Sequence, residues 1–184
     1  MLGADQKTER IFRARKEAAP WEETVENTYD RYLKLFHDES VFCNNVTHVI
    51  AYEEQPWEWC RQGRLKWFTH PEINSAARRV WLYMQEIPPG SRSGKHRHMT
   101  EEQMLVIQGR GYDLHDGARW NWEAGDLVSI PAMVEHQHFN TDGHHPVLLL
   151  SSMPSVGVGL GLGGIEQLED APEFADSGNT QEQR

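Results

Sequence analysis

Between residues 78 and 155 the apolar positions fall into short runs of the kind that form β-strands. Valine, isoleucine and leucine recur in these runs, and clusters of glycine, proline, asparagine and aspartate separate one run from the next. The runs cover residues 79–87, 103–109, 126–131, 136–140 and 147–153. Short strands at near-regular spacing are typical of a β-sandwich or barrel rather than of alternating strands and helices. We therefore predict an all-β domain over residues 78–155.

The residues before this domain follow a different pattern. We expect residues 1–77 to form a helical and irregular extension that packs on the barrel. Pro20 suits the first turn of a helix, because its fixed φ matches the helical backbone. Apolar residues then recur at helical spacing, which predicts one apolar stripe that packs on the domain behind it. The stripe consists of Val25, Tyr29, Tyr32 and Phe36.

Three tryptophans lie close together in this extension, at Trp57, Trp59 and Trp67. Their rings are able to cover a core, line a subunit interface or contact a substrate. Packing is the interpretation we favour, because large aromatic side chains are buried more often than they bind ligands.

The last segment, residues 156–184, predicts a glycine-rich loop followed by an acidic flexible tail. Residues 165–184 carry six acidic residues and one basic residue. Half of the net charge of −10 therefore lies in a polar segment with little to bury.

Charge and composition exclude several classes of protein. A net charge of −10 argues against nucleic-acid binding, which requires a basic surface. The two cysteines, Cys43 and Cys60, form no disulfide framework, and the first residues lack the apolar core of a signal peptide. No apolar stretch is long enough to span a membrane. We expect a soluble, cytoplasmic protein without a membrane or nucleic-acid partner.

The candidate chemistry is concentrated in the predicted β domain, where seven of the ten histidines lie between residues 96 and 145. His96 and His98 point to one face of a strand, because side chains alternate. Glu102 then begins the returning strand, and His136 comes from a later one. Three imidazoles and one carboxylate suit a divalent ion such as iron, manganese, nickel, copper or zinc. The sequence thus predicts a metal site made of His96, His98, Glu102 and His136.

Other histidines are assigned by the same alternation. His138 has the parity of His136, so it faces the interior as a catalytic candidate that orients a substrate, moves a proton or supports the ligands; plain packing is the alternative. Arg97 faces outward and is expected to pair with a carboxylate. The remaining histidines of the domain lie in turn-like segments and are expected to be exposed. They are His115, His144 and His145.

Two sequence motifs in this region resemble those of the cupin superfamily. The segment from Gly90 to Gly109 matches the first cupin motif, G(X)5HXH(X)3,4E(X)6G, at every fixed position. The segment from Gly125 to Asn140 resembles the second, G(X)5PXG(X)2H(X)3N, except that Met133 stands at a glycine position. The resemblance implies a cupin double-stranded β-helix, or jelly-roll barrel, with an N-terminal helical extension. It implies the same four metal ligands.

The resemblance also implies a range of functions. The order of motifs is similar to that of gentisate dioxygenases, although those enzymes use three histidines without the glutamate. Glu102 makes the predicted site more like that of quercetin and acireductone dioxygenases, which have three histidines and one glutamate. Cupins also include lyases, decarboxylases, isomerases and binding proteins, so the fold alone does not select a reaction.

We predict first a mononuclear Fe(II) dioxygenase. Its substrate is a small aromatic or otherwise oxygenated compound that chelates the metal, and dioxygen is the second substrate. The tryptophans near the barrel favour an aromatic ligand. A lyase, decarboxylase or isomerase with manganese, zinc or nickel is one alternative, and a non-catalytic small-molecule-binding cupin is another. We expect a homodimer, as cupins usually pair.

Overall fold

The computed structural model describes residues 27–70, 79–161 and 163–176. The chain divides into two units, residues 1–45 and 46–184. In the first unit, helix α2 (Thr28–Asn45) begins after Asn27, whose Oδ1 accepts a hydrogen bond from the backbone N–H of Asp30 at 2.9 Å. None of its residues is buried. Among the described residues, no helix is long and apolar enough to cross a bilayer.

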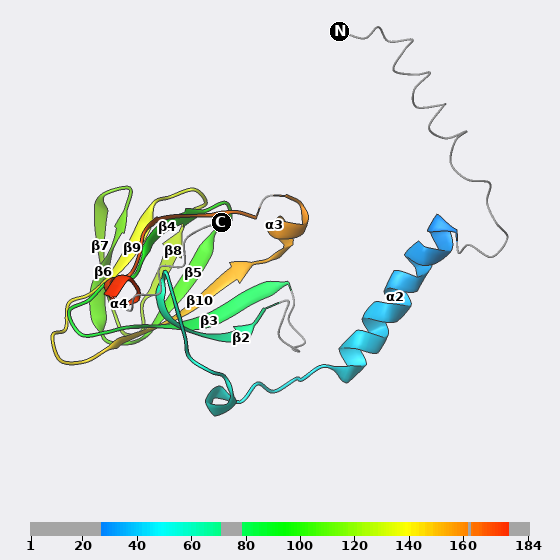
Figure 1. The fold of residues 1–184 in the computed structure, drawn as a ribbon, viewed down its shortest axis with the longest axis horizontal. Helices are drawn as coiled ribbons and strands as arrows, with labels where there is room; N and C mark the ends of the chain where they lie inside the picture. The colour runs from blue at the N-terminus through cyan, green and yellow to red at the C-terminus, as the bar shows by residue number, and fades with distance from the viewer. Residues whose placement is uncertain (1–26, 71–78, 162, 177–184) are drawn as a thin grey trace, which may run out of the picture. The chain divides into compact units, whose positions relative to one another are not determined.

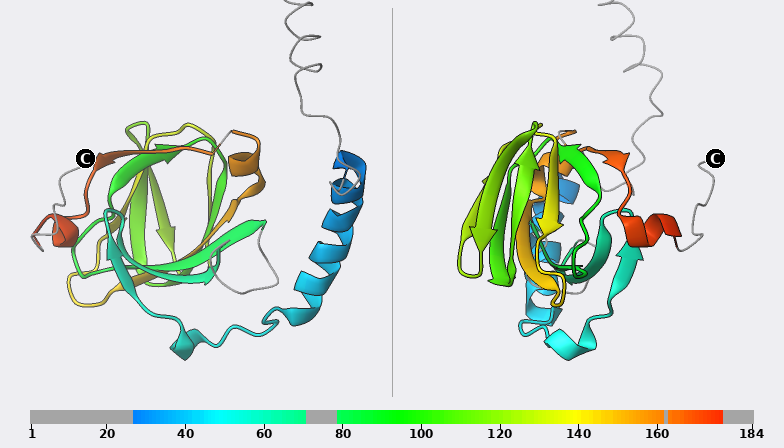
Figure 2. Two further views of the ribbon diagram at one scale, coloured as in Figure 1. Left: turned by 45° about the vertical axis from the view of Figure 1, so that its right-hand side comes forward. Right: turned by 90° about the vertical axis from the view of Figure 1, so that its left-hand side faces the viewer.

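The second unit is a barrel of two antiparallel sheets (Figures 1 and 2). The six-stranded sheet has, in spatial order, β1 (Glu58–Cys60), β2 (Gly63–Thr69), β3 (Val80–Ile87), β10 (Val147–Pro154), β5 (Glu102–Gln108) and β8 (Leu127–Ile130). The five-stranded sheet has β11 (Ile165–Glu169), β4 (Lys95–His98), β9 (His136–Asn140), β6 (Arg110–His115) and β7 (Ala118–Glu123). Three short helical turns complete it: η1 (Tyr52–Glu54), α3 (Val156–Gly159) and α4 (Pro172–Asp176).

Alternation along the central strands builds the core. From Glu102 to Val106 in β5 and along β10 every second residue is buried, so one face of each strand lines the barrel interior. Burying an aliphatic side chain stabilises the fold by about 1.5–3 kcal/mol. The main core cluster comprises Ile87, Met104, Val106, Trp122, Val147 and Leu149. A second cluster of Leu65, Tyr83 and Met153 packs against Cys60, Trp67 and Trp81.

The fold confirms the prediction of an all-β barrel with an N-terminal helix. All five apolar runs identified in the sequence lie in strands. Trp67 packs on the Tyr83 ring, with centroids 4.8 Å apart, as the packing interpretation expected, whereas Trp59 is 48% exposed. Tyr29, Tyr32 and Phe36 lie in α2 and are exposed, whereas Pro20 and Val25 lie outside the described residues. The packing of the extension on the barrel stays a prediction.

Several strands lie where the sequence predicted none. Strands β1 and β2 fall within residues 1–77, where helical and irregular structure was expected, because β2 pairs along β3 and adds its inner face to the core. Strands β6 and β7 carry too many polar residues to show an apolar run. They are nevertheless paired through six residues each. The domain boundaries at 78–155 and 156–184 stay predictions.

The segment after Gly164 is held to the barrel rather than free of it. Strand β11 pairs with β4, with Ile165 opposite His98 and Gln167 opposite His96. Beyond the strand, Ala171 is fully buried and its N–H donates to the Arg61 carbonyl at 2.8 Å. The acidic residues of this segment meet basic side chains of the barrel. These ion pairs are Arg61–Asp170, Arg92–Glu169 and Arg97–Glu166.

Truncation after Gly164 should therefore destabilise the protein, because it removes a paired strand and the buried Ala171. We expect the melting temperature to fall by roughly 5–10 °C, which corresponds to a loss of about 2–3 kcal/mol in a domain of this size. Truncation after Asp176, which keeps β11 and α4, is the matched control in the same thermal melt. Equal melting temperatures for the two truncated chains would show that β11 contributes nothing.

Candidate metal centre

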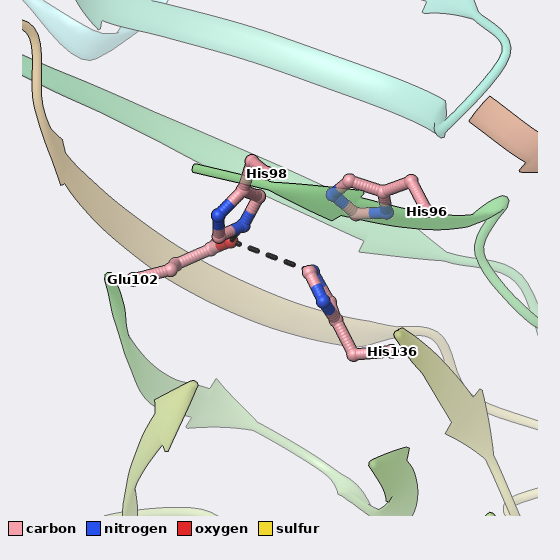
Figure 3. A group of neighbouring side chains, drawn as sticks. All are labelled: His96, His98, Glu102 and His136. Atoms are coloured by element: carbon pink, nitrogen blue, oxygen red, sulfur yellow. Dashed lines mark hydrogen bonds and ion pairs between the residues drawn. The ribbon is translucent and has the colours of Figure 1, made fainter. Parts of the chain in front are cut away.

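Four side chains from three strands meet inside the barrel, as Figure 3 shows. His96 of β4 lies directly opposite His136 of β9 in the register of the five-stranded sheet. Cross-strand partners share a face, so both rings point inward. His98 follows on the same face of β4, and Glu102 opens β5 in the other sheet. The turn between β4 and β5 therefore brings the carboxylate of one sheet to the imidazoles of the other.

The cluster is compact and buried. One nitrogen or carboxylate oxygen from each of the four residues lies within 4.8 Å of the others. The exposed fractions are 6% for His96, 2% for His98, 1% for Glu102 and 0% for His136. The prediction that these four residues converge is confirmed, and they form a cluster that is able to hold a divalent ion.

Backbone carbonyls fix the orientation of two of the imidazoles. Nδ1 of His98 lies 2.6 Å from the Thr100 carbonyl oxygen, and Nδ1 of His136 lies 2.9 Å from that of Val134. A carbonyl only accepts, so each Nδ1 carries the proton and donates it. In the neutral ring the other nitrogen, Nε2, then holds a lone pair. Both Nε2 atoms lie close to the Glu102 carboxylate.

These contacts give a test of whether the residues fit a cation. Nε2 of His98 lies 3.0 Å and Nε2 of His136 lies 3.8 Å from Oε2 of Glu102. Nε2 of His98 is at hydrogen-bond distance from this oxygen, whereas a lone pair on Nε2 of His136 is repelled by it unless a positive charge lies between them. Nε2 of His136 and Nδ1 of His96 are also buried without a hydrogen-bond partner, which is costly for a polar atom. The donor set fits a divalent ion.

The protonation states of these residues also favour metal binding. Burial lowers the pKa of His136 to about 4, aided by the charge of His138, and burial likewise lowers the pKa of His96 well below its usual value. Burial alone would raise the pKa of Glu102, but the His98 hydrogen bond and nearby histidine charges lower it to about 2. At neutral pH the imidazoles of His96 and His136 are therefore neutral and the carboxylate ionised, which are the forms that bind metals.

A second buried group lies behind the cluster. His138 faces the interior, as predicted, and is 1% exposed. Its Nδ1 donates to Oδ1 of Asp113 at 2.9 Å, and the indole N–H of Trp122 donates to the same oxygen at 2.7 Å. Burial opposes charge on both partners, but their mutual attraction holds the pKa of Asp113 well below and that of His138 above its usual value.

Asp113 was not identified from the sequence. It lies on β6, which shows no apolar run, and its role depends on the register that places it directly opposite His138 on β9. The alternation of Gly111, Asp113 and His115 along β6 was the available signal. All three lie on the inward face.

The assignments of the other polar residues had mixed outcomes. The expectation that His115 is exposed in a turn was wrong: it ends β6, its side chain is 12% exposed, and its Nε2 lies 3.3 Å from Oδ2 of Asp113. His144 and His145 are exposed, as expected. Arg97 pairs with Glu166 at 2.6 Å, which confirms its outward position.

Comparisons with known proteins agree with this geometry. The cupin domain family matches residues 83–153. Gentisate 1,2-dioxygenase from Ralstonia sp. is 33% identical over 80 residues, which are 43% of this chain and 22% of that protein. The match thus spans about a fifth of the relative's length.

Solved structures share the fold at low sequence identity. The polyketide cyclase RemF from Streptomyces resistomycificus superposes with a TM-score of 0.56 at 14% identity, over 71% of this chain and 92% of that one. A variant of oxalate decarboxylase OxdC from Bacillus subtilis gives a TM-score of 0.52 at 19% identity, over 64% of this chain and 31% of that one. Residues 83–153 thus match the cupin domain family, and the barrel has the fold of these solved structures.

Replacing a cluster histidine should remove the metal without unfolding the barrel. For His96→Ala or His136→Ala we expect at least about 100-fold weaker metal binding, since even changing a partner of a ligand costs 10–100-fold. The β-rich circular dichroism spectrum should persist, because the strands rest on the apolar core. The exposed His145→Ala is the matched control and should keep a full equivalent in elemental analysis. Full metal content in either cluster variant would refute the ligand assignment.

Proposed function

We propose that this protein is a metal-dependent enzyme and, more specifically, an Fe(II) dioxygenase acting on a small aromatic or otherwise oxygenated compound. The observation that carries the proposal is the buried group of three imidazoles and one carboxylate, with lone pairs that lack a donor. The partial similarity to gentisate 1,2-dioxygenase supports the choice of oxygen chemistry on an aromatic ring.

The four residues define what a bound ion contributes. When bound, a divalent ion supplies a Lewis acid, and iron in addition supplies redox chemistry toward dioxygen. His96, His98, Glu102 and His136 are the residues that would hold it. Tyr83 steadies the carboxylate, since its hydroxyl donates to Oε1 of Glu102 at 2.9 Å and leaves Oε2 facing the imidazoles. Their burial limits the access of bulk water to the site.

His138 is the residue we assign to the substrate. Asp113 accepts its Nδ1 proton, so its Nε2 is the nitrogen left to orient a substrate group or pass a proton in the interior. His138 is thus the catalytic residue of the proposal, and Asp113 is a positioning residue. The homodimer and the cytoplasmic location expected from the sequence stay predictions.

The proposal is tested with protein purified without oxygen. We expect about one equivalent of iron by elemental analysis. A panel of gentisate, catechols and hydroxybenzoates in an oxygen electrode should then include a compound that drives oxygen consumption. Turnover that persists under strict anaerobiosis would contradict the dioxygenase and favour a Lewis-acid lyase, decarboxylase or isomerase. Metal and ligand binding without any turnover would favour a non-catalytic cupin.

His138→Ala should keep the metal and lose turnover by about 100- to 10,000-fold, the usual contribution of a positioned acid or base. Asp113→Asn should keep the metal too, but lower turnover less and change its pH profile, because an amide alters which imidazole nitrogen carries the proton. Unchanged turnover in His138→Ala would remove His138 from the mechanism.

A further inference from the structure

Two non-glycine residues among those described have a positive φ, Asp116 at 47° and Met133 at 68°. Such a backbone is strained for most side chains, and aspartate is one of the few that adopts it readily. The Asp116 side chain also has a local purpose, because its Oδ1 accepts the N–H of Glu135 at 3.0 Å. The conformation of Asp116 therefore needs no further explanation.

Met133 has no comparable local reason. Its N–H donates to the His98 carbonyl at 2.8 Å, which ties the turn before β9 to the strand that carries two cluster histidines. Glycine would make the same backbone hydrogen bond without strain. The Met133 side chain is 54% exposed, so it is not buried in the core either. The turn accounts for the positive φ, but it does not account for a large apolar side chain there.

That side chain lies at a surface pocket of about 200 Å³ which His98 of the metal cluster also lines. Met99 and Ile165 line it as well, and they are 44% and 57% exposed. The ion-paired Arg97 and Glu166 also line it, so the pocket joins three exposed apolar side chains and this ion pair to His98 of the buried centre. A second cavity of about 380 Å³ at Trp120 is lined by none of the four cluster residues.

We propose that Met133 and Met99 form the site for the apolar part of the substrate and that Met133 is a specificity-determining residue. The ligand class is a compound with adjacent oxygen groups at one end, which reach the metal, and a small ring or alkyl group at the other. This inference rests on the proposed function. Two flexible thioether side chains adapt to such a group, and strain retained beside a functional site is a known pattern.

The experiment has a part that depends on no metal or reaction. The methionine methyl groups of the full chain are labelled with ¹³C, and benzene is titrated while their NMR signals are followed. We expect the Met99 and Met133 signals to shift, and those of the core residues Met104 and Met153 to stay in place. Absence of any shift at Met99 and Met133 would overturn the proposal.

Variants of Met133 test whether its side chain binds a ligand or is only tolerated in the turn. Met133→Gly should raise the melting temperature by about 2–4 °C through relief of strain, and weaken benzene binding at Met99 about tenfold. Met133→Leu keeps an apolar side chain on the same backbone and should retain both wild-type values. Trp120→Ala is the control for the second cavity and should bind benzene as wild type does. A Met133→Gly variant that is stabilised and binds benzene unchanged, or one that is not stabilised, would refute the inference.

A second pair of probes distinguishes this inference from the proposed function. Calorimetry of the zinc-loaded protein should show 4-methylcatechol binding about fourfold more tightly than catechol, the contribution of one buried methyl group. Met133→Gly should lose that preference. Benzene binding as predicted, with no binding of either catechol, would contradict the proposed substrate class and leave the apolar site standing. Binding of both catechols with equal affinity in the wild type would contradict the apolar site and leave the proposed substrate class standing.

Discussion

The candidate metal centre depends on a carboxylate and three imidazoles held together in the buried interior of the barrel. The carbonyls of Thr100 and Val134 accept hydrogen bonds from Nδ1 of His98 and His136, so Nε2 of each ring is the nitrogen close to Oε2 of Glu102. Nε2 of His136 has no hydrogen-bond partner there, and a cation would stabilise it. The strands that carry these residues hold them in place, because β4, β5 and β9 are each paired with a neighbouring strand of their sheet.

Two further groups of side chains lie near the metal cluster, one in the interior and one at the surface, and each determines what a ligand would contact. On the interior side, Asp113 fixes one nitrogen of His138 and so defines the other as the one able to face a substrate. On the surface side, Met133 and Met99 flank a pocket that reaches His98. The proposed substrate would thus meet polar groups at its reacting end and the side chains of Met99 and Met133 at its other end.

The sequence predicts a feature of the site well when the residues that form it lie close together along the chain, and poorly when it depends on strands that are distant in sequence. His96, His98 and Glu102 lie within seven residues, so strand alternation and one turn place them without knowledge of the fold. Asp113 depends on the pairing of two strands distant in sequence, and β11 depends on an edge of β4 that no local pattern reveals. The sequence shows that Met133 stands at a glycine position of the second motif, but only the structure shows its positive φ and the pocket beside it.

The most direct test of the central claim is ¹⁵N NMR of the imidazoles as zinc is added to metal-free protein. The account predicts that Nε2 of His98 and of His136 move to metal-bound shifts at one equivalent, while both Nδ1 atoms stay protonated by virtue of their carbonyl partners. Imidazole signals that ignore zinc, or zinc bound through Nδ1 of either residue, would contradict it.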